Sequence, residues 1–194
     1  MLQEGVIVDN NKFSSQVITV SAMLIALGVI LSFLRIPLST VTEITLTGLP
    51  IAVGGYMFGP WIGFLIGALI DICGYFASPR GAFFPGFTIS TALTGMIYGL
   101  LLYRRWWDGQ AGGRGFAGGS QKLLLRIAAA HLLKTVFISL MLNCFWLSIF
   151  YGMDFSAVFL ASVPKEAINF PIEVFLIFSI IRVLRSFMFP GERV

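Results

Sequence analysis

Long apolar runs separated by short polar or Gly/Pro-rich breaks dominate the chain. A membrane-spanning helix needs about 20 mostly apolar residues, and six runs approach that requirement. We expect the six helices at about residues 17–34, 42–58, 61–77, 86–103, 123–150 and 167–187. The pattern therefore predicts an all-α integral membrane protein with six transmembrane helices in a single membrane domain.

The breaks explain where these helices end. Pro37 blocks continuation of the first helix, and Gly59–Pro60 separates the second from the third. Residues 104–122 are polar and rich in glycine, which is typical of a flexible loop. Residues 151–165 are too polar and interrupted to span, so we expect a loop with an interfacial piece there.

Composition supports a lipid environment. Hydrophobic residues make up 57% of the chain and charged residues only 11%, whereas a soluble domain carries about a quarter charged residues. The mean hydropathy is +0.90. So large an apolar excess needs a lipid bilayer around it.

The distribution of basic residues predicts the orientation. With the N-terminus inside, nine Lys and Arg residues fall on the cytoplasmic side and three fall outside. The nine are Lys12, Arg104, Arg105, Arg114, Lys122, Arg126, Arg182, Arg185 and Arg193, and the three are Arg35, Arg80 and Lys165. This asymmetry follows the positive-inside rule and predicts that both termini are cytoplasmic. The net charge of +4 thus reflects topology, and we expect no nucleic-acid partner.

Signatures of catalysis are missing from the sequence. It has no paired-His motif, no nucleophile elbow and no P-loop, so an ATP-driven step would need another polypeptide. Cys73 and Cys144 lie in apolar runs without ligand spacing, and His131 is the only histidine. We therefore expect no metal site and no cofactor.

Two charged residues fall in the middle of predicted helices. Asp71 and Lys134 both lie about ten residues from the cytoplasmic end of their helix, which is about 15 Å into the bilayer. A lone charge at this depth is costly, so we expect them to form an ion pair. The alternative is that one of them belongs to a binding site.

A second group of polar and aromatic residues gathers near the predicted outer face. Lys165, Asn169 and Glu173 are spaced by four and share one face wherever the segment is helical. The candidate binding residues are Arg35, Phe83, Phe84, Asn143, Trp146, Lys165, Asn169 and Glu173. Such a mixture suits a planar heteroaromatic ligand with carboxylates, because aromatic rings stack on it and cations take its acid groups. Taken singly, each residue has an alternative as an interfacial or capping residue.

The first predicted helix carries an A-x-x-x-A motif at Ala22 and Ala26. Small residues four apart let another helix approach closely in lipid. Internal packing would explain the same motif.

Several motifs together resemble a known family. They are A-x-x-x-A at residues 22–26, F-L-R-I-P at 33–37, G-A-F-F-P-G-F-T at 81–88 and N-F-P-I-E-V at 169–174. The chain resembles the substrate-binding S components of energy-coupling-factor (ECF) vitamin transporters, and among them it is most similar to the folate-specific members. The resemblance covers nearly the whole chain, and the block at 81–88 is the most specific part of it.

The resemblance implies a non-catalytic subunit in a bacterial cytoplasmic membrane. Such a subunit captures a vitamin near the extracellular side and delivers it inward together with a transmembrane T component and two ATPases. It implies that Arg35 and Lys165 bind ligand carboxylates and that Phe83, Phe84 and Trp146 stack on the ligand. Asn143, Asn169 and Glu173 would bind the edge of a pterin, and Ala22 and Ala26 would face the T component.

Three alternatives stay open from the sequence. The nearest is an S component for another vitamin, such as pantothenate or a pyrimidine precursor. A small membrane enzyme acting on lipids would need a nucleophile–base or paired-acid set at one depth, which the sequence does not show. A channel or facilitator would need a polar stripe along a whole helix, which the first helix lacks.

Overall fold

The structure is a computed structural model that describes residues 15–37, 43–79, 83–103 and 120–188. Apart from one short ribbon, the elements in these ranges are helices. They are α1 (Ser15–Phe33), β1 (Arg35–Pro37), β2 (Glu43–Thr45), α2 (Gly48–Phe58), α3 (Pro60–Ala77), α4 (Pro85–Leu102), α6 (Ser120–Lys134), the π-helix η1 (Thr135–Leu142), α7 (Asn143–Tyr151) and α8 (Phe155–Met188).

Within the described part of the chain, five helices are long and apolar enough to cross a membrane. They are α1, α3, α4, the continuous helix made by α6, η1 and α7, and α8. The chain is therefore a multi-pass membrane protein by length and composition. The remaining apolar helix, α2, has 11 residues and a length of about 17 Å, short of the roughly 30 Å hydrocarbon core.

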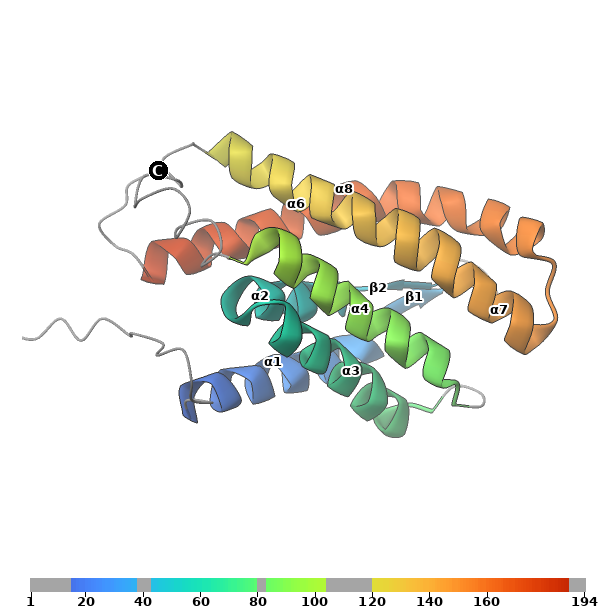
Figure 1. The fold of residues 1–194 in the computed structure, drawn as a ribbon, viewed down its shortest axis with the longest axis horizontal. Coiled ribbons are helices and arrows are strands. Elements are labelled where there is room, and N and C mark those ends of the chain that lie inside the picture. The colour runs from blue at the N-terminus through green and yellow to red at the C-terminus, as the bar shows by residue number, and fades with distance from the viewer. Residues whose placement is uncertain (1–14, 38–42, 80–82, 104–119, 189–194) are drawn as a thin grey trace, which may run out of the picture.

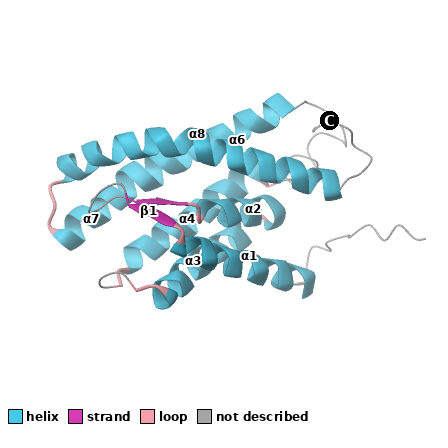
Figure 2. Cartoon of the chain, turned by 180° about the vertical axis from the view of Figure 1, so that it is seen from behind, coloured by secondary structure: helices cyan, strands magenta, loops and turns pink. Residues whose placement is uncertain are grey.

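The helices lie roughly along one long axis (Figure 1). The rod formed by α6, η1 and α7 lies beside α8, and α1 and α3 lie on the other side of the molecule, with α2 and α4 between them (Figure 1). The first turn of α1 and the last turn of α8 are at the same end (Figure 1). Seen from behind, the ribbon of β1 and β2 lies between the two groups of helices (Figure 2). The two strands are antiparallel, with Ile36 opposite Ile44.

Two regions differ from the sequence prediction. The second helix begins at Gly48 and not near residue 42, because residues 43–45 pair as a strand with residues 35–37. The last helix begins at Phe155 and not near residue 167, so the expected loop at 151–165 is mostly helix. Pro164 and Pro171 lie inside α8, and membrane helices tolerate such prolines because neighbouring groups satisfy the freed backbone. By contrast, α1, α3 and α4 lie within two residues of the predicted ranges.

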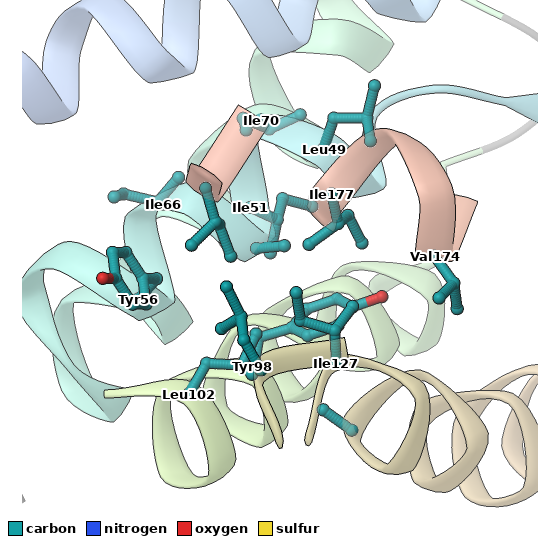
Figure 3. Close-up of a cluster of buried hydrophobic side chains, with 14 residues drawn as sticks. Leu49, Ile51, Tyr56, Ile66, Ile70, Tyr98, Leu102, Ile127, Val174 and Ile177 are labelled. Carbon is teal, nitrogen blue, oxygen red and sulfur yellow. The ribbon is translucent and has the colours of Figure 1, made fainter. Parts of the chain in front are cut away.

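A cluster of buried aliphatic and tyrosine side chains joins the two groups of helices. Figure 3 shows Tyr98 of α4 among Ile51 of α2, Ile127 of α6 and Ile177 of α8. All four are almost completely buried. This cluster fixes α4 and α8 relative to each other, and the candidate site lies between these two helices.

Glycines bring α2, α3 and α4 into backbone contact. A Cβ placed on Gly63 of α3 would lie 2.6 Å from the carbonyl oxygen of Gly95 on α4, and one on Gly55 of α2 would lie 2.7 Å from the backbone nitrogen of Gly99. In lipid, helices associate largely through such close packing of small residues. These glycines therefore set the spacing of the three helices.

We expect Gly95→Val to destabilise the protein by about 1–3 kcal/mol or more, because backbone atoms opposite it cannot move aside. The matched control is Ala129→Val on the exposed side of α6, which adds volume toward lipid. Thermal unfolding in detergent compares the two. Equal unfolding temperatures of the two variants would show that the α3–α4 contact can accommodate a larger side chain at Gly95.

Candidate substrate-binding site

A polar cavity of about 140 Å³ lies between α2, α4, η1 and α8, next to β2. Hydroxyl, amide, ammonium and carboxylate groups line most of it. The lining residues are Thr45, Thr47, Gly48, Ile51, Ser90, Thr91, Thr94, Lys134, Ile138, Ser139, Asn143, Lys165, Glu166, Asn169 and Glu173. Polar groups at membrane depth are costly and usually functional, so this cavity is the candidate ligand site.

Four of the eight candidate binding residues line this cavity: Asn143, Lys165, Asn169 and Glu173. Three of them come from one face of α8, as the spacing of four predicted. That face is extended by Glu166, which also lines the cavity and is 4% exposed. The sequence prediction missed Glu166 because it placed the start of the helix after it.

The Glu173 carboxylate is held from several sides. Asn169 Nδ2 donates to Glu173 Oε1 at 3.0 Å, and Lys134 Nζ lies 3.5 Å from Glu173 Oε2. His131 Nδ1 lies 3.3 Å from the same Oε2. Glu173 also lies against Gly48, the first residue of α2, where a Cβ would be 3.2 Å from Oε2. A helix N-terminus favours negative charge, so this position stabilises the carboxylate.

The predicted ion pair between Asp71 and Lys134 is wrong. Asp71 accepts a hydrogen bond from Thr88 Oγ1 at 2.6 Å, with Thr91 Oγ1 at 3.5 Å from its other oxygen. Lys134 instead pairs with Glu173 on α8. Two charged residues at equal depth in the bilayer can pair only when their helices are neighbours. Depth alone does not say which helices are neighbours.

The second lysine of the cavity is also paired. Lys165 Nζ lies 3.2 Å from Glu166 Oε1, while Thr135 Oγ1 lies 3.5 Å from Glu166 Oε2. The cavity thus carries two cations and two carboxylates that compensate each other. A ligand group that enters it meets no large net charge.

The π-helix η1 brings residues of the fifth helix to this cavity. The backbone N–H of Asn143 donates to the carbonyl of Ile138, five residues back. Lys134 and Asn143 are nine positions apart, which is two and a half turns of an α-helix and would put them on opposite faces. In the i→i+5 register nine positions make about two turns, so both residues face the cavity.

Several buried polar atoms around the cavity have no hydrogen-bond partner among the described residues. They are Asn143 Oδ1, Asn169 Oδ1, Ser90 Oγ, Trp146 Nε1 and His131 Nε2. Most buried polar groups in proteins are paired, so such a cluster needs an explanation. Asn143, Asn169 and Ser90 line the cavity, where a bound ligand would supply the missing partners.

The three aromatic candidates, Phe83, Phe84 and Trp146, are not among the residues that line this cavity. Phe84, which precedes α4, contacts Trp146 with ring centroids 5.4 Å apart and Phe150 at 4.9 Å. Phe83 is separate from this group, because it packs on Tyr75 of α3 at 5.0 Å. Arg35 belongs to β1, but its side chain lies outside the described part of the structure.

Other lining residues carried only a weak sequence signal. Ser90, Thr91 and Thr94 lie on one face of α4, yet hydroxyl residues are common in membrane helices and gave no reason to select them. Ser139 comes to the cavity through the π-helix, which the sequence pattern did not indicate.

The two alanines of the A-x-x-x-A motif on α1 point away from the helix bundle. Ala22 and Ala26 are exposed. Gly28 is buried, and the side chain of Ile70 on α3 occupies the space that a side chain at position 28 would need. Exposure of both alanines leaves them available to another helix.

Comparisons with known proteins agree with this architecture. The family model for the ECF transporter, substrate-specific component, matches residues 16–181. "Folate transporter FolT" of Clostridium novyi (strain NT) is 33% identical over 130 residues, which are 67% of each chain. "Folate transporter FolT" of Leuconostoc mesenteroides is 27% identical over 172 residues, covering 84% of this chain and 83% of the relative. A solved structure, the crystal structure of FolT bound with folic acid, superposes with a TM-score of 0.70 at 28% identity, covering 93% of this chain and 96% of the other.

A helical membrane domain around a buried polar cavity defines a membrane protein that binds a small molecule. The chain belongs to the family of substrate-specific components of ECF transporters. It is therefore a substrate-binding transporter subunit and not an enzyme, which removes the lipid-enzyme alternative. The resemblance read from the sequence motifs is confirmed, including the similarity to folate-specific members.

Proposed function

We propose that this chain binds folate in the cavity between α4, η1 and α8. The observation that carries the proposal is its likeness, over nearly the whole length of both chains, to the structure of FolT bound with folic acid. We further propose that both termini are cytoplasmic and that the chain works in the bacterial cytoplasmic membrane. It would capture folate from outside and deliver it inward with a T component and two ATPases.

The chemistry of the cavity supports this ligand. A pterin ring carries hydrogen-bond donors and acceptors along one edge, and the amides of Asn143 and Asn169 each offer an unpartnered oxygen to donors. Because the cavity charges already compensate each other, a neutral ring system enters it without leaving an unpaired charge. Phe84 and Trp146 contact each other edge to face and form one aromatic surface on which a ligand ring could pack. Arg35, Lys165 and Phe83 remain our candidates for the carboxylate and p-aminobenzoate portions.

Titration of the purified protein tests the proposal. We expect quenching of tryptophan fluorescence by folic acid and by 5-formyltetrahydrofolate, and no response to pantothenate or thiamine. Asn143→Leu should weaken folic acid binding about tenfold, because the amide loses a hydrogen bond worth about 1–1.5 kcal/mol. The matched control is Ser179→Ala, since Ser179 is outside the cavity lining. A response to pantothenate or thiamine alone would overturn the folate assignment and favour another vitamin.

Exposure of Ala22 and Ala26 supports α1 as the face that meets the T component. We expect Ala22→Trp and Ala26→Trp to leave folic acid binding intact and to abolish co-purification with the T component and the ATPases, because a bulky ring separates the helices. Leu27→Trp is the matched control, since Leu27 is also exposed but points about 140° away from Ala22 and about 100° away from Ala26 around the helix. Normal complex formation by both alanine variants would exclude this face.

A further inference from the structure

A buried tyrosine–histidine pair lies behind the Glu173 carboxylate. Tyr98 of α4 and His131 of α6 are both 0% exposed, and Tyr98 Oη lies 2.8 Å from His131 Nδ1. The same Nδ1 lies 3.3 Å from Glu173 Oε2 on α8. Side chains from three helices thus come together at the Nδ1 atom of His131. Neither Tyr98 nor His131 lines the cavity, but Glu173 does.

The contact with Glu173 favours one tautomer of the His131 imidazole. An ionised carboxylate only accepts hydrogen bonds, so the approach of Oε2 is favourable when Nδ1 bears the hydrogen. The oxygen of Tyr98 is then a second acceptor for the same N–H. His131 Nε2 is left as an acceptor, and it has no partner among the described residues.

This arrangement costs stability. The pair lies against the aliphatic core, where Figure 3 shows Tyr98 among Ile51, Ile127 and Ile177. Burying polar groups there is unfavourable, and an unpartnered Nε2 adds to that cost. An apolar side chain of similar size in place of His131 would pack without it. The polar pair therefore needs a role other than holding the helices together.

We propose that His131, backed by Tyr98, is a positioning residue that orients the Glu173 carboxylate for ligand recognition. This inference rests on the proposed function. Asn169 holds Oε1, and His131 and Lys134 hold Oε2, so the carboxylate has three fixed contacts. Glu173 and the neighbouring Gly48 both line the cavity, so a ligand in the cavity can reach the carboxylate. A carboxylate fixed in this way meets a ligand donor without losing rotational freedom on binding.

The test compares folic acid affinity in four single variants and one double variant by tryptophan fluorescence in detergent. His131→Phe keeps a ring of similar size but loses the N–H, and we expect affinity to fall about 10- to 100-fold. His131→Asn places an amide N–H near the position of Nδ1 and should recover most of the loss. Tyr98→Phe removes only the hydroxyl and should cost about twofold to fivefold, well below the effect of a lost contact to a charged group.

The fourth variant, Glu173→Gln, separates positioning from folding. If His131 acts through Glu173, adding His131→Phe to Glu173→Gln should change affinity by less than about threefold, since coupled residues are not additive. Equal affinities of His131→Phe and the wild type would overturn the inference alone. So would equal losses in His131→Asn and His131→Phe, or a full His131→Phe effect on the Glu173→Gln background. A wild-type protein that ignores folic acid would overturn the proposed function and this inference with it.

Discussion

Deleting Met141 from the π-helix is expected to weaken folic acid binding about 100-fold. Met141 is exposed and does not line the cavity, so the deletion acts through helix register and not through a lost contact. With one residue fewer, an α-helical segment would place Lys134 and Asn143 about 80° apart around the helix. Asn143 and the following Trp146 would turn away from their present positions, and two lost interactions of about 1–1.5 kcal/mol each give this loss.

A second deletion provides the control. Removing both Leu140 and Met141 leaves seven positions between Lys134 and Asn143, which is about two turns of an α-helix. This restores both side chains to one face, so we expect much of the affinity to return in the shorter variant. Isothermal titration of the two proteins, after a size-exclusion check of folding, measures the difference. Weaker binding by the double deletion than by the single one would show that the π register does not organise the site.

Lys134→Met is expected to destabilise the protein by about 3–5 kcal/mol. Among the described residues, Lys134 supplies the ammonium group that lies within 4 Å of the buried Glu173 carboxylate. Removing one partner of a buried pair leaves the other charge uncompensated. Thermal or denaturant unfolding in detergent without ligand measures the loss.

Replacing both partners should recover much of this stability. In Lys134→Met with Glu173→Leu the apolar pair needs no counter-charge, so the double variant should unfold near the wild-type temperature while failing to bind folic acid. Pairing Lys134→Met with Asp71→Leu is the matched control, because Asp71 bonds Thr88 and not Lys134. Rescue by Asp71→Leu in place of Glu173→Leu would contradict the arrangement of charges described above.

Much of the architecture could be predicted from local properties of the sequence. The apolar runs at 15–33, 60–77 and 85–102 are long and bounded by Pro or polar residues, so their helices follow directly from hydropathy. Spacing by four along α8 predicted that Lys165, Asn169 and Glu173 act on one surface. These inferences needed only the period of one helix and the thickness of a bilayer.

Contacts between helices could not be predicted in the same way. The partner of Lys134 depends on which helix lies opposite it, and many arrangements satisfy the same depth. The sequence pattern did not predict the π-helix, because Thr135–Leu142 is mostly apolar and fits an α-helix as well as a π-helix. The start of α8 at Phe155 was hidden by Pro164, whose cost in the helix is offset by its surroundings.

Folate binding is the central claim, and the small molecules carried by the protein itself test it most directly. The protein is purified in mild detergent from its native host or from cells supplied with folate, denatured, and its released ligands are identified by mass spectrometry. We predict a folate in near-stoichiometric amount from the wild type and a much smaller amount from the single Met141 deletion. Release of a different vitamin in that amount, with no folate, would contradict the account.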